Sequence, residues 1–361
     1  MPNRRTFLAG LSAAVLSPTA SWAAAGAPDF LSGARTAGGS YVLAGLRGTG
    51  EVAFTLDLPG RGHAAAAHPV RPLAVAFARR PGTFAIVLDC ASGDVIARLE
   101  APEGRHFYGH GVFSAEGDIF YATEHDYEAG QGVISVWNTS DFTRRDEFPS
   151  GGVGPHDIAL MPSGHRLVIA NGGIETHPDS GRAKLNIPTM RPNLSYFGID
   201  GGRVETVELE GALHKNSIRH LAVRSDGLVA FAMQWQGDGS VEPPLLGLHK
   251  AGAQPQLLQA APEDQRRMMG YAGSVSISSD GTLAAISSPL GGLAHVYELG
   301  TGKMVAEYEA SDICGLGPVK GGFFFTTGTG ASGRIGGSDV TDAATSRLSW
   351  DNHLVAIPKP G

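Results

Sequence analysis

The chain has 361 residues, of which 17% are charged, and a formal net charge of −7. An acidic chain without a basic run is a poor candidate for binding nucleic acid or an anionic lipid surface. The 51 glycines and 22 prolines favour many short strands joined by tight turns, and the length is sufficient for a large core.

Residues 1–25 have the pattern of an export signal. Arg4 and Arg5 precede an apolar run that ends at Leu16, and small residues after the run offer a site for signal peptidase. The paired arginines resemble the twin-arginine (Tat) motif; an ordinary secretory signal is the alternative. The apolar run is too short to cross a bilayer, which takes about 20 residues. We expect a periplasmic protein exported by the Tat pathway, with residues 26–361 as one domain and no membrane anchor after cleavage.

A loose repeat runs through the rest of the chain. Each repeat has a glycine or polar lead-in and a short apolar strand, and often a turn and further strands follow. Groups of four strands that recur about every 40 to 60 residues are typical of a β-propeller. The lead-in and first strand of each repeat lie at residues 61–65, 108–113, 154–159, 218–223, 271–276, 312–316 and 351–355.

The two ends of the chain predict how the ring closes. Strands of the later type, at residues 41–46 and 52–58, come first without an initial strand, and a first-type strand at 351–355 comes last. One blade built from both ends accounts for both facts and leaves no free sheet edge. We therefore predict an all-β, seven-bladed β-propeller closed by N- and C-terminal strands in one blade. Six or eight blades are the alternatives.

Residues 172–196 break the rhythm of strands. This segment holds charged and polar side chains, among them Glu175, His177, Lys184 and Arg191, without strand alternation. Loops of this length are uncommon unless they have a function. We expect a long ordered loop between the second and third strands of its blade, and a disordered segment is the alternative.

The strongest chemical pattern is a set of histidines at one position of the repeat. Five of the thirteen histidines occupy the start of a first strand, and a cysteine occupies it in another repeat. Because first strands line the central channel, these side chains should converge on the axis. Imidazole and thiolate are ligands of zinc, copper and iron. We predict a transition-metal site; the alternative is a structural role in hydrogen bonds between blades. The predicted ligands are His63, His110, His156, His220 and His353, with Cys314 as a further candidate.

Chain direction predicts which other side chains join these histidines. In a propeller blade, the loop into the first strand and the loop from the second to the third strand lie on the same face. Residues at the ends of second strands can therefore bind a ligand, orient an imidazole or act in acid–base catalysis. Solvated loop charges and loop braces are the alternatives. The candidates from this argument include Glu124, His125, Asp126, Asn171, Glu175, His177 and Trp235. Arg191 and Asn193, farther along the chain, are separate candidates that could hold an anion, with a loop brace as the alternative.

Several stretches resemble an uncharacterised family of Tat-exported bacterial periplasmic β-propellers. They are the start of the chain and residues 154–157, 170–178, 191–196 and 233–237. The resemblance covers nearly the whole mature chain. Members of that family tend to be encoded beside imelysin-like iron-uptake proteins, so the resemblance implies a role around iron or another transition metal and periplasmic iron-uptake proteins as partners. It assigns no activity and no site residue.

The sequence thus predicts a monomeric periplasmic propeller that binds iron, copper or zinc and acts in iron or copper acquisition or homeostasis. Two other functions stay open. A metal-dependent or lactonase-like enzyme would use a metal at the axis to activate water. A protein-interaction scaffold would have no chemistry at all. No nucleophile elbow, phosphate loop or dinucleotide motif points to another activity.

Overall fold

The computed structural model describes residues 20–79, 83–181, 183–336 and 339–358. The paired arginines of the predicted export signal lie outside the described residues. Within those ranges, no helix has the length and apolar character needed to cross a membrane.

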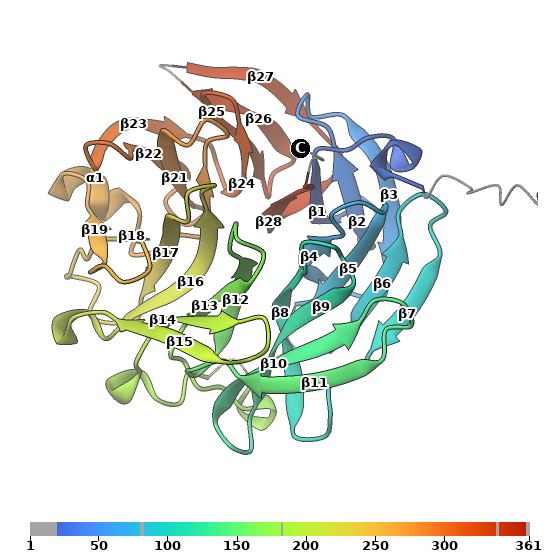
Figure 1. Ribbon diagram of the computed structural model, residues 1–361. Coiled ribbons are helices and arrows are strands. Elements are labelled where there is room, and N and C mark those ends of the chain that lie inside the picture. The colour runs from blue at the N-terminus through green and yellow to red at the C-terminus, as the bar shows by residue number, and fades with distance from the viewer. Residues whose placement is uncertain (1–19, 80–82, 182, 337–338, 359–361) are drawn as a thin grey trace, which may run out of the picture.

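Seven four-stranded antiparallel sheets stand around a central axis and confirm the predicted seven-bladed β-propeller (Figure 1). From the axis outward, the blade that joins the two ends of the chain consists of β28 (Ser349–Ala356), β1 (Phe30–Arg35), β2 (Tyr41–Leu46) and β3 (Val52–Leu58). Residues Phe30 and Ala356 are partners in its β1–β28 ladder. The predicted closure by both termini is therefore confirmed.

The other six blades follow in chain order, each again given from the axis outward. The first of them contains β4 (Gly62–Ala67), β5 (Leu73–Ala78), β6 (Ala85–Asp89) and β7 (Val95–Leu99). The second contains β8 (Arg105–Phe113), β9 (Ile119–Asp126), β10 (Gln131–Asn138) and β11 (Arg144–Pro149). The third contains β12 (Pro155–Leu160), β13 (Arg166–Asn171), β14 (Asn193–Gly198) and β15 (Arg203–Glu208). The fourth contains β16 (Asn216–Val223), β17 (Val229–Trp235), β18 (Leu246–His249) and β19 (Gln256–Leu258). The fifth contains β20 (Ser274–Ile277), β21 (Leu283–Ser288), β22 (Leu293–Glu298) and β23 (Lys303–Glu309). The sixth contains β24 (Ile313–Val319), β25 (Gly322–Thr327), β26 (Ala331–Gly336) and β27 (Asp339–Thr345).

Short helices occupy some of the connections. They are η1 (Trp22–Ala25), η2 (Pro178–Ser180), η3 (Ile187–Thr189), η4 (Gly211–Leu213) and α1 (Pro262–Arg267).

The core lies between the blades rather than at the axis. Second strands such as β5 and β25 are buried along their whole length, because each sheet packs between two others, whereas the outermost strand β7 is mostly exposed. Val168, Tyr196, Phe231 and Met233 belong to one apolar cluster that joins two blades. Burying such surface contributes about 25 cal/mol per Å². These interfaces fix the innermost strands and the side chains at their starts.

Six of the seven innermost strands carry a β-bulge at or beside the position where the repeat has its histidine or cysteine; β20 pairs with its neighbour in uninterrupted register. In β16 the extra residue is Arg219, and His220 itself pairs with Ala232. The extra residues include His63 on β4, His110 on β8 and His156 on β12. A bulge leaves a residue outside the ladder and re-aims its side chain. The bulges therefore turn these side chains toward the axis, a device that the repeat pattern does not reveal.

The predicted long loop joins β13 to β14, as expected, but it is shorter than the sequence indicated. It ends before Asn193, because residues 193–196 form the start of β14 and pair with both β13 and β15. Inside the loop, the Asn186 side chain accepts a hydrogen bond from the Glu175 amide at 2.8 Å and donates one to the Gly173 carbonyl at 2.9 Å. This bracing holds the middle of the loop against its base.

Candidate metal centre

The structure brings the five predicted histidines together at the axis. They come from five consecutive blades, on strands β28, β4, β8, β12 and β16 (Figure 1). Each imidazole centroid lies 4.4–5.3 Å from that of the next, and the last pair closes the circle at 4.8 Å. We call this group the histidine ring; it consists of His63, His110, His156, His220 and His353.

His110 occupies the central position of the histidine ring. Its centroid lies within 5.9 Å of the centroids of all four other imidazoles. Two sets of three histidines, His63–His110–His353 and His110–His156–His220, each place one nitrogen per ring within 4.8 Å of the others. Metal–nitrogen bonds of about 2.0–2.1 Å put ligand nitrogens about 3–4 Å apart. The rings would bind an ion after moving inward by about an ångström.

Three ring nitrogens have no hydrogen-bond partner among the described residues although they are buried. They are Nε2 of His110, Nδ1 of His156 and Nε2 of His353. A buried polar atom without a partner costs about 1–3 kcal/mol, and native proteins contain few of them. Three in one cluster point to a ligand that is held by imidazole nitrogens.

Asp157 orients the central histidine and sets its tautomer. Its Oδ1 lies 3.0 Å from Nδ1 of His110, and its Oδ2 accepts a hydrogen bond from the amide of Leu221 at 2.9 Å. Burial would raise the pKa of Asp157, but His110, His220 and the Leu221 amide hold that pKa below its usual range. The resulting carboxylate keeps the proton on Nδ1 and leaves the Nε2 lone pair free for a metal.

Burial keeps other imidazoles of the histidine ring neutral. It lowers the pKa of His220 to about 3, with His110 as the next cause. Burial also lowers the pKa values of His156 and His353 well below 6.5. The next cause is the charge of Arg219 for His156 and the interaction with His63 for His353. Metals bind the neutral form of imidazole, so these rings need not lose a proton near neutral pH to become ligands.

Cys314, the sixth candidate ligand, lies outside the histidine ring. Its Sγ lies 3.3 Å from the carbonyl oxygen of Asp351 and 3.4 Å from that of Thr326, inside an apolar cluster between two blades. Burial raises the pKa of this thiol to about 12. Cys90 is also a buried free thiol, in another cluster.

The candidates at the end of β9 form separate networks. Glu124 is fully buried and receives two hydrogen bonds from Arg144, at 2.7 and 3.0 Å. Asp126 pairs with Arg105 at 3.2 Å. His125 is fully buried, and its centroid lies 5.7 Å from that of His106. These side chains stabilise their own blade and lie outside the two sets of ligand histidines.

The remaining candidates also serve contacts elsewhere. Asn171 is buried and bonds to Ser150, Asn193 and Ser195. In the long loop, Nδ1 of His177 accepts a hydrogen bond from the amide of Asp179, and the Glu175 amide donates to Asn186. Arg191 forms an ion pair with Glu208 on the surface. The Trp235 indole donates a hydrogen bond to the Asp238 carbonyl.

A pocket of 220 Å³ covers one side of the histidine ring. Its floor is formed by His63, His156, His220 and His353, whereas His110 does not line it. A second cavity, the central channel of 530 Å³, is lined by the innermost strands and includes His110, Asp157, His220 and His353. Four imidazoles thus line the pocket, two of them (His220 and His353) line both cavities, and His110 lines the channel alone.

The sequence reasoning did not identify Asp157 as a site residue, nor the basic residues of the pocket. Asp157 directly follows a ring histidine, and this His-Asp pair is the sequence signal that could have identified it. Arg219 directly precedes His220 in the same way, while Lys184 reaches the pocket from the long loop. Their proximity depends on contacts between blades, which a single sequence does not show.

Comparison with known proteins places the chain as follows. Residues 56–357 match the family described as "Protein of unknown function (DUF1513)". No curated protein shows significant similarity to the chain. Among solved structures, it is similar to Kuenenia stuttgartiensis hydrazine synthase, with 14% identity, a TM-score of 0.58, and coverage of 85% of this chain and 89% of that chain. At this identity the similarity shows the propeller fold alone.

Proposed function

Because this chain belongs to the DUF1513 family, whose description assigns no activity, we propose a function from its own residues: it binds one divalent transition-metal ion through the histidine ring. One observation carries the proposal. Five imidazoles from five blades converge, and three of their buried nitrogens have no hydrogen-bond partner among the described residues.

The donor set favours a particular group of metals. Each of the two sets of candidate ligands consists of imidazoles alone, without thiolate or carboxylate. Imidazole suits copper(II), zinc, nickel and iron(II), and among divalent ions copper(II) binds most tightly to a given nitrogen site. We propose copper or iron as the native ion, with zinc as a competitor.

The site holds one ion rather than two. Both sets of three histidines contain His110. Asp157 engages Nδ1 of that histidine, so Nε2 alone remains as a ligand. One lone pair serves one ion, and the two sets therefore share it.

Two measurements test the proposal. One is metal analysis of the protein purified from its native host, and the other is calorimetric titration of metal-free protein with Cu²⁺, Zn²⁺ or Fe²⁺. We expect close to one equivalent of metal and a loss of binding in His110→Ala, which disrupts both sets. His165→Ala, at an exposed position on a turn, is the matched control and should bind normally. Less than about a tenth of an equivalent, with no uptake on titration, would refute the metal site.

We further propose that the protein acts in the periplasm, after export through the Tat pathway, in iron or copper acquisition. The pattern of residues 1–25 and the family resemblance support this role. Cell fractionation tests the location. Replacement of both Arg4 and Arg5 by lysine should retain the protein in the cytoplasm, and unchanged export would favour an ordinary secretory signal.

A metal-dependent enzyme is the second candidate function. The pocket of 220 Å³ above four imidazoles favours it, because a ligand placed there would face the ion directly. Turnover of a lactone or a thiol by the metal-loaded protein, abolished in His110→Ala, would support an enzyme rather than a carrier.

A further inference from the structure

The pocket above the histidine ring is walled by basic residues. Arg79 follows β5, Arg219 lies in the bulge of β16, and Lys184 comes from the loop between β13 and β14. None of the described residues that line the pocket is Asp or Glu. The propeller thus gathers three cations from three separate parts of the chain over one small cavity.

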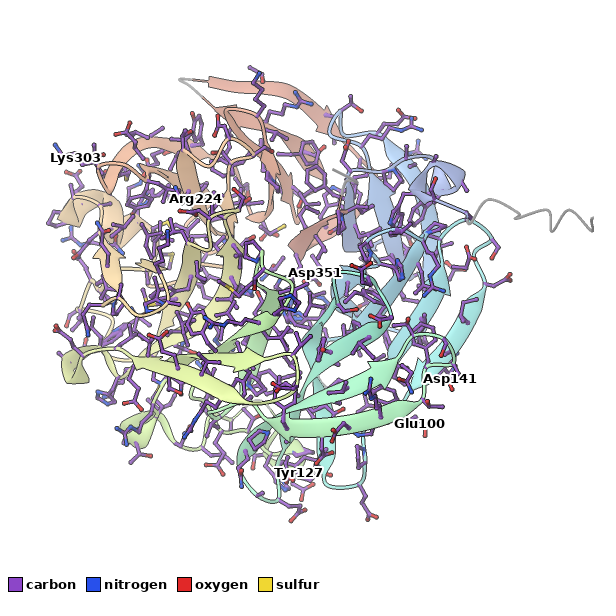
Figure 2. The ribbon with its side chains drawn as sticks, in the orientation of Figure 1. Glu100, Tyr127, Asp141, Arg224, Lys303 and Asp351 are labelled. Atoms are coloured by element: carbon purple, nitrogen blue, oxygen red, sulfur yellow. The ribbon has the colours of Figure 1, made fainter. Side chains whose placement is uncertain are left out.

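One of these cations has an acidic partner. Arg79 pairs with Asp351 at 2.7 Å, but Asp351 is shared with Arg61 at the same distance (Figure 2 shows Asp351 near the axis). Lys184 donates to the neutral side-chain amide of Gln236. Lys184 has a lowered pKa, chiefly through burial and then through the charge of Arg219, so these two cations lie within electrostatic reach of each other.

A bound metal would add positive charge beside this pocket. Imidazole ligands bring no charge of their own, so a divalent ion in the histidine ring would be offset in part by the Asp157 carboxylate, 3.0 Å from His110, next to the pocket that Arg219 and Lys184 line. Like charges at close range in a partly buried site cost free energy unless an anion offsets them. The arrangement of cations and imidazoles is therefore suited to an anionic ligand.

We infer that this pocket binds a small oxyanion, with one oxygen on the metal and the others on Arg219 and Lys184. The inference rests on the proposed metal site for the floor of the pocket. A planar guanidinium matches the paired oxygens of a carboxylate or phosphate. Tyr271 and Asn352 also line the wall as uncharged polar groups.

The size of the pocket limits the anion. Its 220 Å³ lies below the roughly 300–1,000 Å³ typical of pockets for drug-sized ligands. A dicarboxylate or an inorganic phosphate fits this description, and a nucleotide does not. The long loop then has a function: it carries Lys184 to the pocket.

Calorimetric titration with malonate, and separately with inorganic phosphate, tests the inference in metal-free protein and in protein loaded with Zn²⁺. We expect binding that tightens about tenfold or more on metal loading. Lys184→Gln and Arg219→Gln should each weaken binding of the anion about tenfold while leaving metal stoichiometry at one. Lys303→Gln, at the outer rim of the molecule, is the matched control (Figure 2). Tighter binding of malonate would identify a dicarboxylate as the ligand class, and tighter binding of inorganic phosphate would identify a phosphate.

The outcomes separate the inference from the proposed function. Metal uptake without binding of either anion overturns the inference and leaves the metal site standing. Binding of an anion to a protein that takes up no metal overturns the metal site, and with it the contact between anion and metal, and leaves only an anion site made of basic residues. Anion binding that is unaffected by both Lys184→Gln and Arg219→Gln places the anion elsewhere and also overturns the inference.

Discussion

At the scale of single residues, Asp157 decides how the central ligand is presented. It holds the proton of His110 on Nδ1 and at the same time accepts the Leu221 amide, so it joins three blades. In Asp157→Asn, the amide can still accept from Leu221 but no longer supplies the charge that orients the imidazole. Loss of such a partner typically costs 10–100-fold in metal affinity. We expect that loss in a Cu²⁺ titration, with the exposed Asp141→Asn as control. Unchanged affinity would show that Asp157 is merely structural.

The same residues predict how stability depends on pH in the metal-free protein. Burial holds the pKa of His220 at about 3 and those of His156 and His353 well below 6.5. Below about pH 6.5 these histidines bind protons in the unfolded chain but stay unprotonated in the folded chain. The free energy of unfolding should therefore fall as pH falls from about 6.5 toward 3, by up to about 1.4 kcal/mol per pH unit for each ring.

Urea unfolding in the presence of EDTA, at about pH 7, pH 6 and pH 5, measures this slope. His220→Gln removes one titrating group, and its slope should be smaller than that of the original protein. A free energy of unfolding that stays constant over this range would contradict the burial of neutral imidazoles.

At the scale of elements, bulges rather than regular strands create the site. In the bulge of β8, Gly109 has φ of +107°, and a Cβ added there would lie 2.3 Å from Cδ2 of His63. Gly109→Ala should displace that imidazole, weaken metal binding and lower stability by about 1–3 kcal/mol. Gly252→Ala is the matched control, because Gly252 also has positive φ (+81°) and its added Cβ would have no neighbour within 4 Å.

Metal titration and urea unfolding of both variants separate the two effects. The control should lose stability through backbone strain alone and keep its metal affinity. Equal metal affinity in the two variants would mean that the position of His63 does not matter.

The local geometry of the strands also explains why the sequence could not predict the direction of every candidate side chain. The repeat aligned Cys314 with the histidines, and Cys314 lies in a bulge as His63 does, yet the bulge of β24 directs the thiol toward Thr326 and the next blade. At the end of β9, Glu124 turns to Arg144 instead of the axis. A repeat fixes which strand a residue occupies, but the side-chain direction depends on the local bulge and on the partner across the sheet.

At the scale of the whole molecule, circular closure made the histidine ring predictable. The five histidines are spread from His63 to His353, and only a closed ring of blades brings them to one point. The seven first strands and the shared terminal blade could be identified from the sequence, since each repeat carries its own strand and turn pattern. The basic pocket could not, because it combines Arg79 after β5, Arg219 in the bulge of β16 and Lys184 in a loop, and the repeat pattern does not specify where these three side chains point.

A metal at the axis would therefore link five of the seven blades. Binding to the folded state alone adds about 2.7 kcal/mol of stability at a metal concentration 100 times the Kd. For a domain of this size, that corresponds to a rise in Tm of roughly 5 °C. We expect this rise when metal-free protein is loaded with Cu²⁺ or Zn²⁺ and followed by circular dichroism. His110→Ala should show no rise, because both sets of ligands contain that residue. An equal rise in the variant would place the stabilising metal on the surface, away from the axis.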